Sequence, residues 1–499
     1  MNSSFLYRFC KKALWLIALL LTGGVCLLNI FYNSTVASTG YETVSVSSHF
    51  LIGVLDLVII GSLVMLLRLC GGSLEHTDER KLFRFLTGVY CVMAAYLIFN
   101  VDPTIRADAK TVFQTAREVK AGIYSAFQPG HYLYRYPHQL GLMQYDRILM
   151  LFSENTQFVF FVNFLLVLGI NRTVWKISEE LFHDRITNLL TIVLSFAFLP
   201  QFFFILFAYG LIPGFFFMLL SFYHGLIYAR TGKAVDAAVL VLSAGLAVLL
   251  KQNFLIGGIA IGIFLFLQLL KEKKIRNLTV MAALVLSMLL PAEVLKFCYE
   301  KAAGVQLDDP SPTVLWIAMG TDMDNNVRGP GWYDSSSWNL YNAAAYDAEL
   351  ASDFGKQKLA ENWEKMKKDP SGAGTFFLEK TISQWCDPMY ESTWSGPLED
   401  CGQYTHTPIL QSVYTGGIWA SILTAGMKLL CLALWIFAAA FLVFWGREST
   451  GWEPMYLYFI GGLLFHTFWE GKSQYTYPYL FVLIPYASWA VSRFISFRK

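Results

Sequence analysis

Long apolar runs recur along the whole chain and are separated by short polar or basic segments. Most are about 17 to 25 residues long, the length that an α-helix needs to cross the hydrocarbon core of a bilayer. The runs are continuous, whereas the strands of a membrane barrel alternate between apolar and polar residues. The pattern therefore predicts an all-α polytopic membrane protein. Thirteen stretches qualify as candidates: 13–32, 50–70, 83–100, 138–153, 156–171, 186–207, 210–230, 235–250, 253–270, 277–298, 419–446, 454–470 and 475–495.

Basic residues between these stretches predict the topology, because cytoplasmic loops are rich in Lys and Arg. Basic clusters lie at the N-terminus, in "ERKLFR" near residue 80, in "KEKKIR" at 271–276 and at the C-terminus. If all thirteen stretches crossed, "KEKKIR" would lie outside. The weakest stretch is 138–153, which contains Asp146 and Arg147. If it is re-entrant or interfacial, every basic cluster falls inside. We expect about twelve crossings, and thirteen if 138–153 also crosses.

Two segments outside the membrane follow from this topology, namely 101–137 and 299–418. Between Val305 and Trp419 the chain holds sixteen Asp or Glu against seven Lys or Arg, with one helical stretch at roughly 342–368. We divide the chain into an N-terminal transmembrane domain (1–298, including the outer loop 101–137), a small extracytoplasmic domain (299–418) and C-terminal transmembrane helices (419–499). Cys386 and Cys401 fall in the outer domain and could form a disulfide there or remain unpaired.

Composition agrees with a membrane protein, since 55% of the 499 residues are hydrophobic and only 15% are charged. The net charge of +2 is too small to suggest a nucleic-acid partner, and the chain has no basic tail, so we expect none. The first apolar run follows basic residues, as in a signal peptide. However, it is longer than the usual apolar core and lacks a convincing cleavage site, so we expect a retained helix.

Cations on the outer face break the positive-inside rule, and each therefore calls for a reason. Arg106 and Arg135 lie in the first outer loop, Lys251 in a short outer turn, and Lys472 with Glu470 between the last two helices. Together they suit an anionic headgroup, such as a phosphate on a lipid. Alternatively, the cations extend to the interface without a ligand, and Glu470 with Lys472 forms a local ion pair.

Two aspartates lie at the same membrane edge. A carboxylate there can act as a general base on a hydroxyl group. Asp102 precedes a proline and could instead begin a turn, and Asp108 could simply cap the helix that its surroundings predict. The nearby stretch "GHYLYRYPHQLGL" (130–142) brings Tyr136, His138 and Gln139, which suit sugar rings and hydroxyls but are equally typical of an interfacial aromatic belt.

The order of these pieces resembles the membrane-embedded GT-C glycosyltransferases, in particular bacterial members related to the protein O-mannosyltransferase and aminoarabinose transferase group. The likeness is carried over nearly the whole chain by "RADAKTV", "GHYLYRYPHQLGL", "KQN", "WIAMG" with "GPGWY", and "GGLLFHTFWEGKSQYTYPY".

The resemblance implies an inverting transfer of a sugar from a polyprenyl-phosphate donor to an acceptor hydroxyl at the outer face, with no metal or other cofactor. It assigns the general base to Asp108, although Ala109 stands where many members carry an acidic or amide residue, which leaves Asp102 open. Lys251 and Arg135 would bind phosphate. Four residues near the C-terminus would line the sugar or headgroup pocket: Glu470, Lys472, Gln474 and Tyr475. The acceptor could be a protein, a cell-wall polymer or another lipid.

Two other functions fit the same pattern. A lipid-linked sugar or polysaccharide transporter would carry charged residues inside its spans, whereas the predicted spans keep most charges at their ends. A non-catalytic scaffold of envelope assembly is the third. The general character of the sequence is typical of a bacterial plasma-membrane protein.

Overall fold

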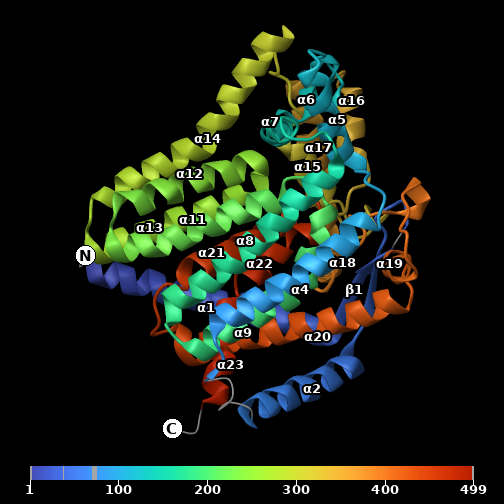
Figure 1. Ribbon diagram of the computed structural model, residues 1–499. Coiled ribbons are helices and arrows are strands. Elements are labelled where there is room, and N and C mark those ends of the chain that lie inside the picture. The colour runs from blue at the N-terminus through green and yellow to red at the C-terminus, as the bar shows by residue number, and fades with distance from the viewer. Residues whose placement is uncertain (1–2, 38, 70–75, 497–499) are drawn as a thin grey trace.

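The computed structural model describes residues 3–37, 39–69 and 76–496, and most of them are helical (Figure 1). Within these ranges, eight helices are long and apolar enough to cross a membrane, or nine if one bent pair counts as a single span. They are α1 (Ser3–Phe31), α2 (Phe50–Leu69), α4 (Glu79–Phe99), α8 (Thr156–Phe182), α11 (Leu211–Thr231), α13 (Leu255–Glu272), α14 (Arg276–Ala303) and α20 (Ile418–Phe441). The protein is therefore a polytopic helical membrane protein.

The connection between α1 and α2 is an antiparallel hairpin of β1 (Tyr32–Val36) and β2 (Val44–Ser48), in which Tyr32 pairs with Ser48. The sequence analysis predicted an all-α protein and no strand in this linker. The hairpin does not stand alone, because the backbone N–H of Ser34 donates to the Cys386 carbonyl at 3.2 Å. Strand β1 is thereby joined to the C-terminal half of the chain.

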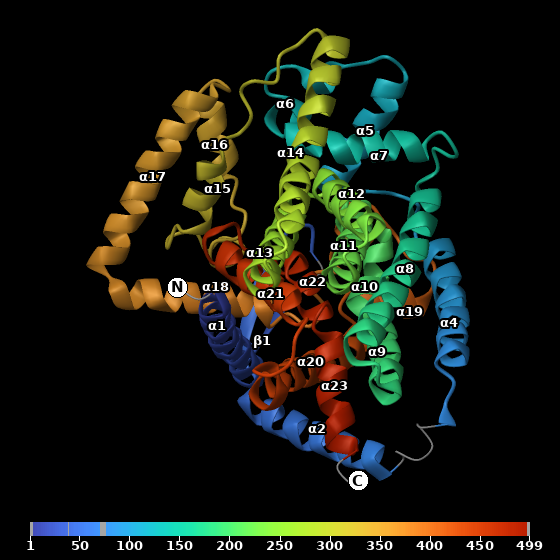
Figure 2. The same cartoon turned by 90° about the vertical axis from the view of Figure 1, so that its left-hand side faces the viewer.

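The segment between α4 and α8 folds into α5 (Ala107–Lys120), the single-turn α6 (Tyr132–Arg135) and α7 (Leu140–Leu149). A helix rises about 1.5 Å per residue, so the 10 residues of α7 cover only about half of the hydrocarbon core. This agrees with the expectation that 138–153 does not cross. Figures 1 and 2 show α5, α6 and α7 together near the C-terminal end of α14.

Two stretches expected as single helices are interrupted. The stretch 186–207 divides into α9 (Arg185–Ala197) and α10 (Leu199–Phe203), which continues as a 3-10 turn and is bent by 49° from α9. The stretch 475–495 divides into α22 (Tyr477–Phe481) and α23 (Ile484–Ile495). A proline at the second position of α10, α22 and α23 explains the breaks, because it lacks the N–H that a continuing helix needs. The remaining helices of the bundle are α12 (Ala234–Leu250) and α21 (Glu453–Phe468).

The segment 299–418 contains five helices instead of the one expected at roughly 342–368. They are α15 (Thr313–Gly320), α16 (Ser336–Ala343), α17 (Ala348–Lys368), α18 (Pro370–Trp385) and α19 (Pro408–Tyr414). Three of them have only seven or eight residues, too few for an apolar period to be recognised.

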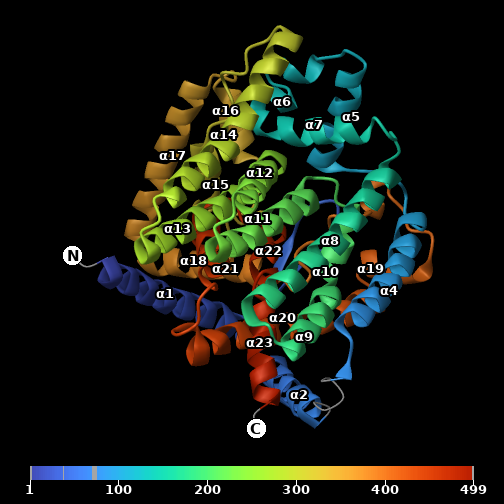
Figure 3. The ribbon, with the colours of Figure 1, turned by 60° about the vertical axis from the view of Figure 1, so that its left-hand side comes forward.

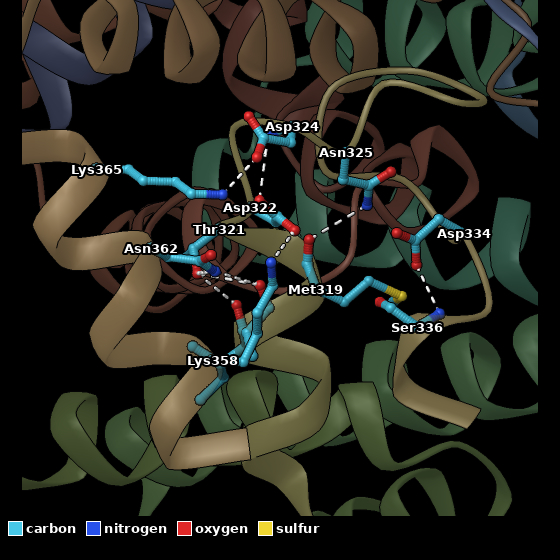
Figure 4. A network of polar contacts seen from close by, with 12 residues as sticks. Met319, Thr321, Asp322, Asp324, Asn325, Asp334, Ser336, Lys358, Asn362 and Lys365 are labelled. Atoms are coloured by element: carbon cyan, nitrogen blue, oxygen red, sulfur yellow. Dashed lines mark hydrogen bonds and ion pairs between the residues drawn. The ribbon is translucent and has the colours of Figure 1, made fainter. Parts of the chain in front are cut away.

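One face of α17 holds the loop that follows α15 (Figure 4). The Lys358 ammonium lies 2.7 Å from the Asp322 carboxylate, and Lys365 pairs with Asp324. Between them, the Asn362 side chain donates to the Ala318 carbonyl at 2.8 Å. The acidic residues of this loop are thus neutralised by lysines of the neighbouring helix.

Lys380 of α18 joins three chain segments. Its side chain is buried and donates to the carbonyls of Gly320, Thr467 and Trp469, at the ends of α15 and α21. The main chains approach closely here, since a Cβ atom on Gly320 would lie 2.5 Å from the Trp469 oxygen. Lys380 therefore fixes the loop that begins at Trp469.

Both cysteines considered for a disulfide are free: Cys386 is buried and Cys401 is exposed. The disulfide expected as one alternative does not form. Burial separates the two thiols, because the Cys386 side chain packs inside the helical bundle while Cys401 lies at the surface.

The basic clusters gather at one end of the bundle. Lys11 near the start of α1 lies 3.8 Å from the Glu453 carboxylate at the start of α21, and Arg493 lies 3.7 Å from Asp184. In Figure 3 the start of α1 lies near the turn between α13 and α14, whereas α5, α6 and α7 lie at the other end of α14. The outer cations of the sequence analysis belong to that other end.

Candidate functional site

Segments that follow three different helices meet around Asp108. Asp108 comes after α4, Lys251 directly follows α12, and Lys472 follows α21. We define the Asp108 cluster by its shared contacts and electrostatic interactions; its members are Asp108, Tyr132, Arg135, Gln139, Tyr209, Lys251, Glu470, Lys472 and Tyr475.

The Tyr209 hydroxyl lies at the centre of the Asp108 cluster. It is 3.5 Å from Asp108 Oδ2, 2.8 Å from the Tyr132 hydroxyl and 3.0 Å from the Gln139 amide nitrogen. Two tyrosines and an amide thus orient one carboxylate through a short hydrogen-bond chain. The Lys251 ammonium lies 4.5 Å from the centre of the Tyr209 ring and 5.3 Å from that of Tyr475, which places it over aromatic faces.

Asp108 does not cap its helix. The N-cap of α5 is Arg106, which makes no capping bond, and Asp108 lies inside the first turn. The preceding Ala107 has a φ of 53°, a left-handed conformation that costs a non-glycine residue free energy. The Asp108 side chain keeps an exposed side, yet the surrounding protein desolvates it and raises the pKa of its carboxyl group. A raised carboxyl pKa favours a group that accepts a proton during a reaction.

Lys251 and Arg135 place two cations near this carboxylate. Burial, and then the charge of Lys472, lower the pKa of Lys251 to about 7. The Arg135 guanidinium stacks 3.9 Å from the centre of the Trp338 ring, and its buried Nε atom has no hydrogen-bond partner. Both side chains therefore have bonding capacity left for an anion.

Lys472 is surrounded by carboxylates. It pairs with Glu42 from the turn of the β1–β2 hairpin, and Arg328 lies 3.6 Å from the same carboxylate. Burial disfavours the Lys472 charge, but Glu42, Glu391 and Glu470 outweigh it and raise the pKa of Lys472 above its usual value. Burial raises the pKa of Glu470 to about 7. Lys472 hence stays protonated at any physiological pH.

A strained turn carries the third buried acid beside Lys472. Tyr390 and Glu391 have φ angles of 51° and 55°, and Asp387 holds the turn by accepting from the Glu391 N–H at 2.9 Å. Glu391 accepts from the Gln474 N–H at 2.8 Å, while its Oε1 atom is buried without a partner. Burial, reinforced by the charge of Glu42, raises the pKa of Glu391 to about 8.

The other predicted residues lie at varying distances from the Asp108 cluster. Tyr136 packs 5.8 Å from His138 and 6.1 Å from Trp316, measured between ring centres. The Gln474 side chain is buried, and its Oε1 atom has no partner. Tyr136 and His138 therefore border the cluster, whereas the Gln474 backbone N–H contacts Glu391, which is not a member of the cluster.

Asp102 and Arg106 make their contacts elsewhere. Asp102 Oδ2 accepts from the Tyr404 N–H at 2.7 Å, and Oδ1 lies 3.3 Å from His406. This is the structural, turn-forming role that the sequence analysis kept as an alternative. Arg106 stacks 3.9 Å from the centre of the Trp394 ring, on which Lys472 also lies at 5.7 Å.

Sequence reasoning missed several residues of this region, namely Glu42, Tyr132, Tyr209, Arg328, Glu391 and Trp394. Two of them could have been noticed: Tyr132 lies within the quoted stretch 130–142, and Glu42 is the one carboxylate in a linker devoid of cations. The rest stand in segments with no local pattern. Among the described residues, no group of three or more His, Cys, Asp or Glu side chains could hold a metal ion.

A family model described as conserved hypothetical integral membrane protein matches residues 6–494. The chain belongs to this family. No curated protein and no solved structure matches it. Membership establishes that this family member is an integral membrane protein, which agrees with the apolar helices of the structure. What the Asp108 cluster can do chemically follows from its geometry: a carboxylate with a raised pKa lies beside cations that can bind an anion.

Proposed function

We propose that this protein is an inverting glycosyltransferase of the GT-C type. It takes a sugar from a polyprenyl-phosphate donor and transfers it to an acceptor hydroxyl at the outer face of a bacterial plasma membrane. The observation that carries the proposal is the Asp108 cluster itself, in which Asp108, Lys251, Arg135 and Lys472 meet although they come from distant parts of the chain. About twelve crossings belong to the same proposal, because that number puts all these segments outside.

In the proposed reaction Asp108 accepts the proton of the acceptor hydroxyl. The oxygen attacks the anomeric carbon, the bond from this carbon to the phosphate oxygen breaks, and the phosphate leaves with the bonding electrons. Cations stabilise the negative charge on the leaving phosphate. A single displacement of this kind inverts the anomeric centre.

Each cluster residue takes a role from its position. Lys251 and Arg135 bind the phosphate, because both retain free donors close to Asp108. Tyr209 and Tyr132 orient the Asp108 carboxylate. The remaining predicted residues line the sugar-binding site, namely Tyr136, His138, Gln139, Glu470, Lys472, Gln474 and Tyr475. Asp102 forms the contact with the 404–406 segment and is not the base.

Transport of a lipid-linked sugar is the second candidate, and one observation favours it. Charged side chains are buried inside two spans: Asp56 of α2 lies 3.1 Å from His49, and the Lys428 ammonium of α20 donates to the Tyr32 carbonyl at 2.7 Å. The sequence analysis expected such charges at the span ends. Buried ionisable groups of this kind are typical of transport pathways, although both contacts here also join the hairpin to the bundle.

Sugar transfer in isolated membranes tests the proposal directly. A radiolabelled pool of polyprenyl-phosphate sugar is supplied to membranes that contain wild type, Asp108→Asn or Asp102→Asn at equal protein levels. We expect Asp108→Asn to lose about 10²- to 10⁴-fold in rate, the usual contribution of a general base, while Asp102→Asn keeps most of its activity. If both variants behave like wild type while lipid-linked sugar crosses the membrane, the transporter replaces the transferase.

A further inference from the structure

A separate pocket lies on the other side of the first turn of α5. We call it the Arg106 pocket, and its wall includes Ile105, Arg106, Phe160, Phe207, Trp394 and Ser395. Ala107, Ala109 and Ala208 also line it. Asp108, between the first two, and Tyr209, directly after Ala208, belong instead to the Asp108 cluster. The same two chain segments thus border both sites.

Two polar groups of the Arg106 pocket are buried without a partner. Arg106 donates through Nε to the Gly396 carbonyl at 3.1 Å and stacks on Trp394, but its Nη2 atom is buried and makes no hydrogen bond. The Ser395 hydroxyl is equally buried and unpaired. Unpaired buried donors destabilise a fold, and an oxyanion could accept from both.

The carboxylates that act on Arg106 are offset by other groups, because Lys472 and Arg328 pair with Glu42 and burial raises the pKa of Glu391. Asp102 also lines the pocket, but its two carboxylate oxygens are engaged by the Tyr404 N–H and by His406. Most of the remaining wall is apolar, with Ile105, Phe160 and Phe207 facing the same space. A guanidinium beside an apolar wall fits an anionic head group that continues into hydrocarbon.

The position of the pocket supports an amphiphilic ligand. Parts of its wall adjoin three candidate membrane spans, because Val101 follows α4, Phe160 lies near the start of α8, and the segment 206–208 precedes α11. On the first two of these helices, near the pocket, the side chains of Phe99 and Phe161 are 70% and 48% exposed, as expected for lipid-facing residues. A ligand can therefore reach the pocket from the lipid–water boundary.

We propose that the Arg106 pocket binds the oxyanion head of an amphiphilic acceptor, a phosphate or carboxylate carried on a hydrocarbon chain. Its role as acceptor site rests on the proposed function, whereas its affinity for the anion does not. An anchored head lies within one helical turn of Asp108, so that a hydroxyl on the same molecule reaches the base. The acceptor is then a membrane lipid, one of the classes that the sequence alone left open.

Counting bound dodecyl phosphate by native mass spectrometry tests this inference on the full-length protein. We expect wild type to bind two molecules, one in the Asp108 cluster and one in the Arg106 pocket. Arg106→Met should lose one of them with at least about a tenfold drop in affinity, since a charge-assisted contact disappears. Lys251→Met combined with Arg135→Met, which removes both proposed phosphate ligands of the Asp108 cluster, should lose the other one. Arg117, half exposed on the same helix α5, provides the matched control, and Arg117→Met should still bind two.

Three outcomes separate the possibilities. If Arg106→Met still binds two molecules, the inference is wrong. If inorganic phosphate displaces the pocket-bound probe as effectively as added dodecyl phosphate does, the ligand is a free anion and the lipid acceptor is wrong. If the combined Lys251→Met and Arg135→Met variant still binds two molecules while Arg106→Met loses one, the phosphate site of the proposed function fails while the pocket stands. Should Arg106→Met not fold, Ser395→Ala carries the test through a several-fold loss of the pocket-bound molecule.

Discussion

Lys251 should lose its positive charge close to neutral pH, and this loss should limit sugar transfer in alkaline solution. Burial, with help from the Lys472 charge, brings its pKa to about 7. The charged form exists below this pKa and disappears as the pH rises through it. Because the charged form is the one that binds phosphate, kcat/KM should fall above neutrality.

The size of the effect follows from the pKa. One unit above it, at pH 8, about a tenth of Lys251 carries a proton, so kcat/KM should be about tenfold below its plateau. Glu470 and Glu391, with pKa values of about 7 and 8, gain negative charge over the same interval and act in the same direction. On the acid side, protonation of Asp108 removes the base, so the profile should be bell-shaped.

Lys251→Arg isolates the contribution of Lys251, because arginine stays charged throughout and can also stack on Tyr209 and Tyr475. We expect its kcat/KM to decline several-fold less than that of wild type between pH 7 and pH 8.5. Lys472→Arg is the control and should keep the alkaline fall, since the pKa of Lys472 is raised. The measurement is initial-rate transfer from the lipid-linked donor at each pH. An alkaline fall that is identical in wild type and Lys251→Arg would refute the reasoning.

Three further predictions follow from the contacts of single residues. Lys380→Met leaves three main-chain carbonyls without their donor and should lower the free energy of unfolding by about 3 kcal/mol, measured as a lower Tm in detergent. The control Lys367→Met loses one exposed ion pair and should change the free energy of unfolding by less than about 0.5 kcal/mol, so equal shifts in the two variants would contradict the role of Lys380. Tyr209→Phe keeps the ring under Lys251 but removes the hydroxyl that orients Asp108, so kcat should fall about tenfold with an unchanged Tm; an unchanged kcat would exclude this hydroxyl from the site. Cys401 is exposed and free, so a membrane-impermeant maleimide should label it in intact cells without reductant while buried Cys386 stays unlabelled; labelling of Cys401 only after reduction would indicate a disulfide.

Helix positions were largely predictable, because the energy that selects them is local. A run of about twenty apolar residues is stable in hydrocarbon whatever lies beside it, and α1, α2, α4 and α20 lie where such runs occur. Interruptions were harder to predict, since the proline of α10 or α23 breaks a helix only where neighbouring elements satisfy the freed backbone groups.

Parts of the candidate site were also predictable. The positive-inside rule identifies cations that lie on the unexpected side, and it singled out Lys251, Lys472 and Arg135. The structure brings these residues to Asp108 because the ends of their helices lie at one face of the bundle. Their roles remain a prediction until transfer is measured.

The sequence by itself determined that the chain is an integral membrane protein and where its apolar helices lie, since both depend on residues close together in the chain. Only the tertiary structure decided that Tyr209 joins Asp108 to Tyr132, that Glu42 of the hairpin holds Lys472, and that a strained turn presents Glu391. The physical reason is that these contacts form between segments far apart in sequence, where side-chain packing, rather than any local period, selects the partner.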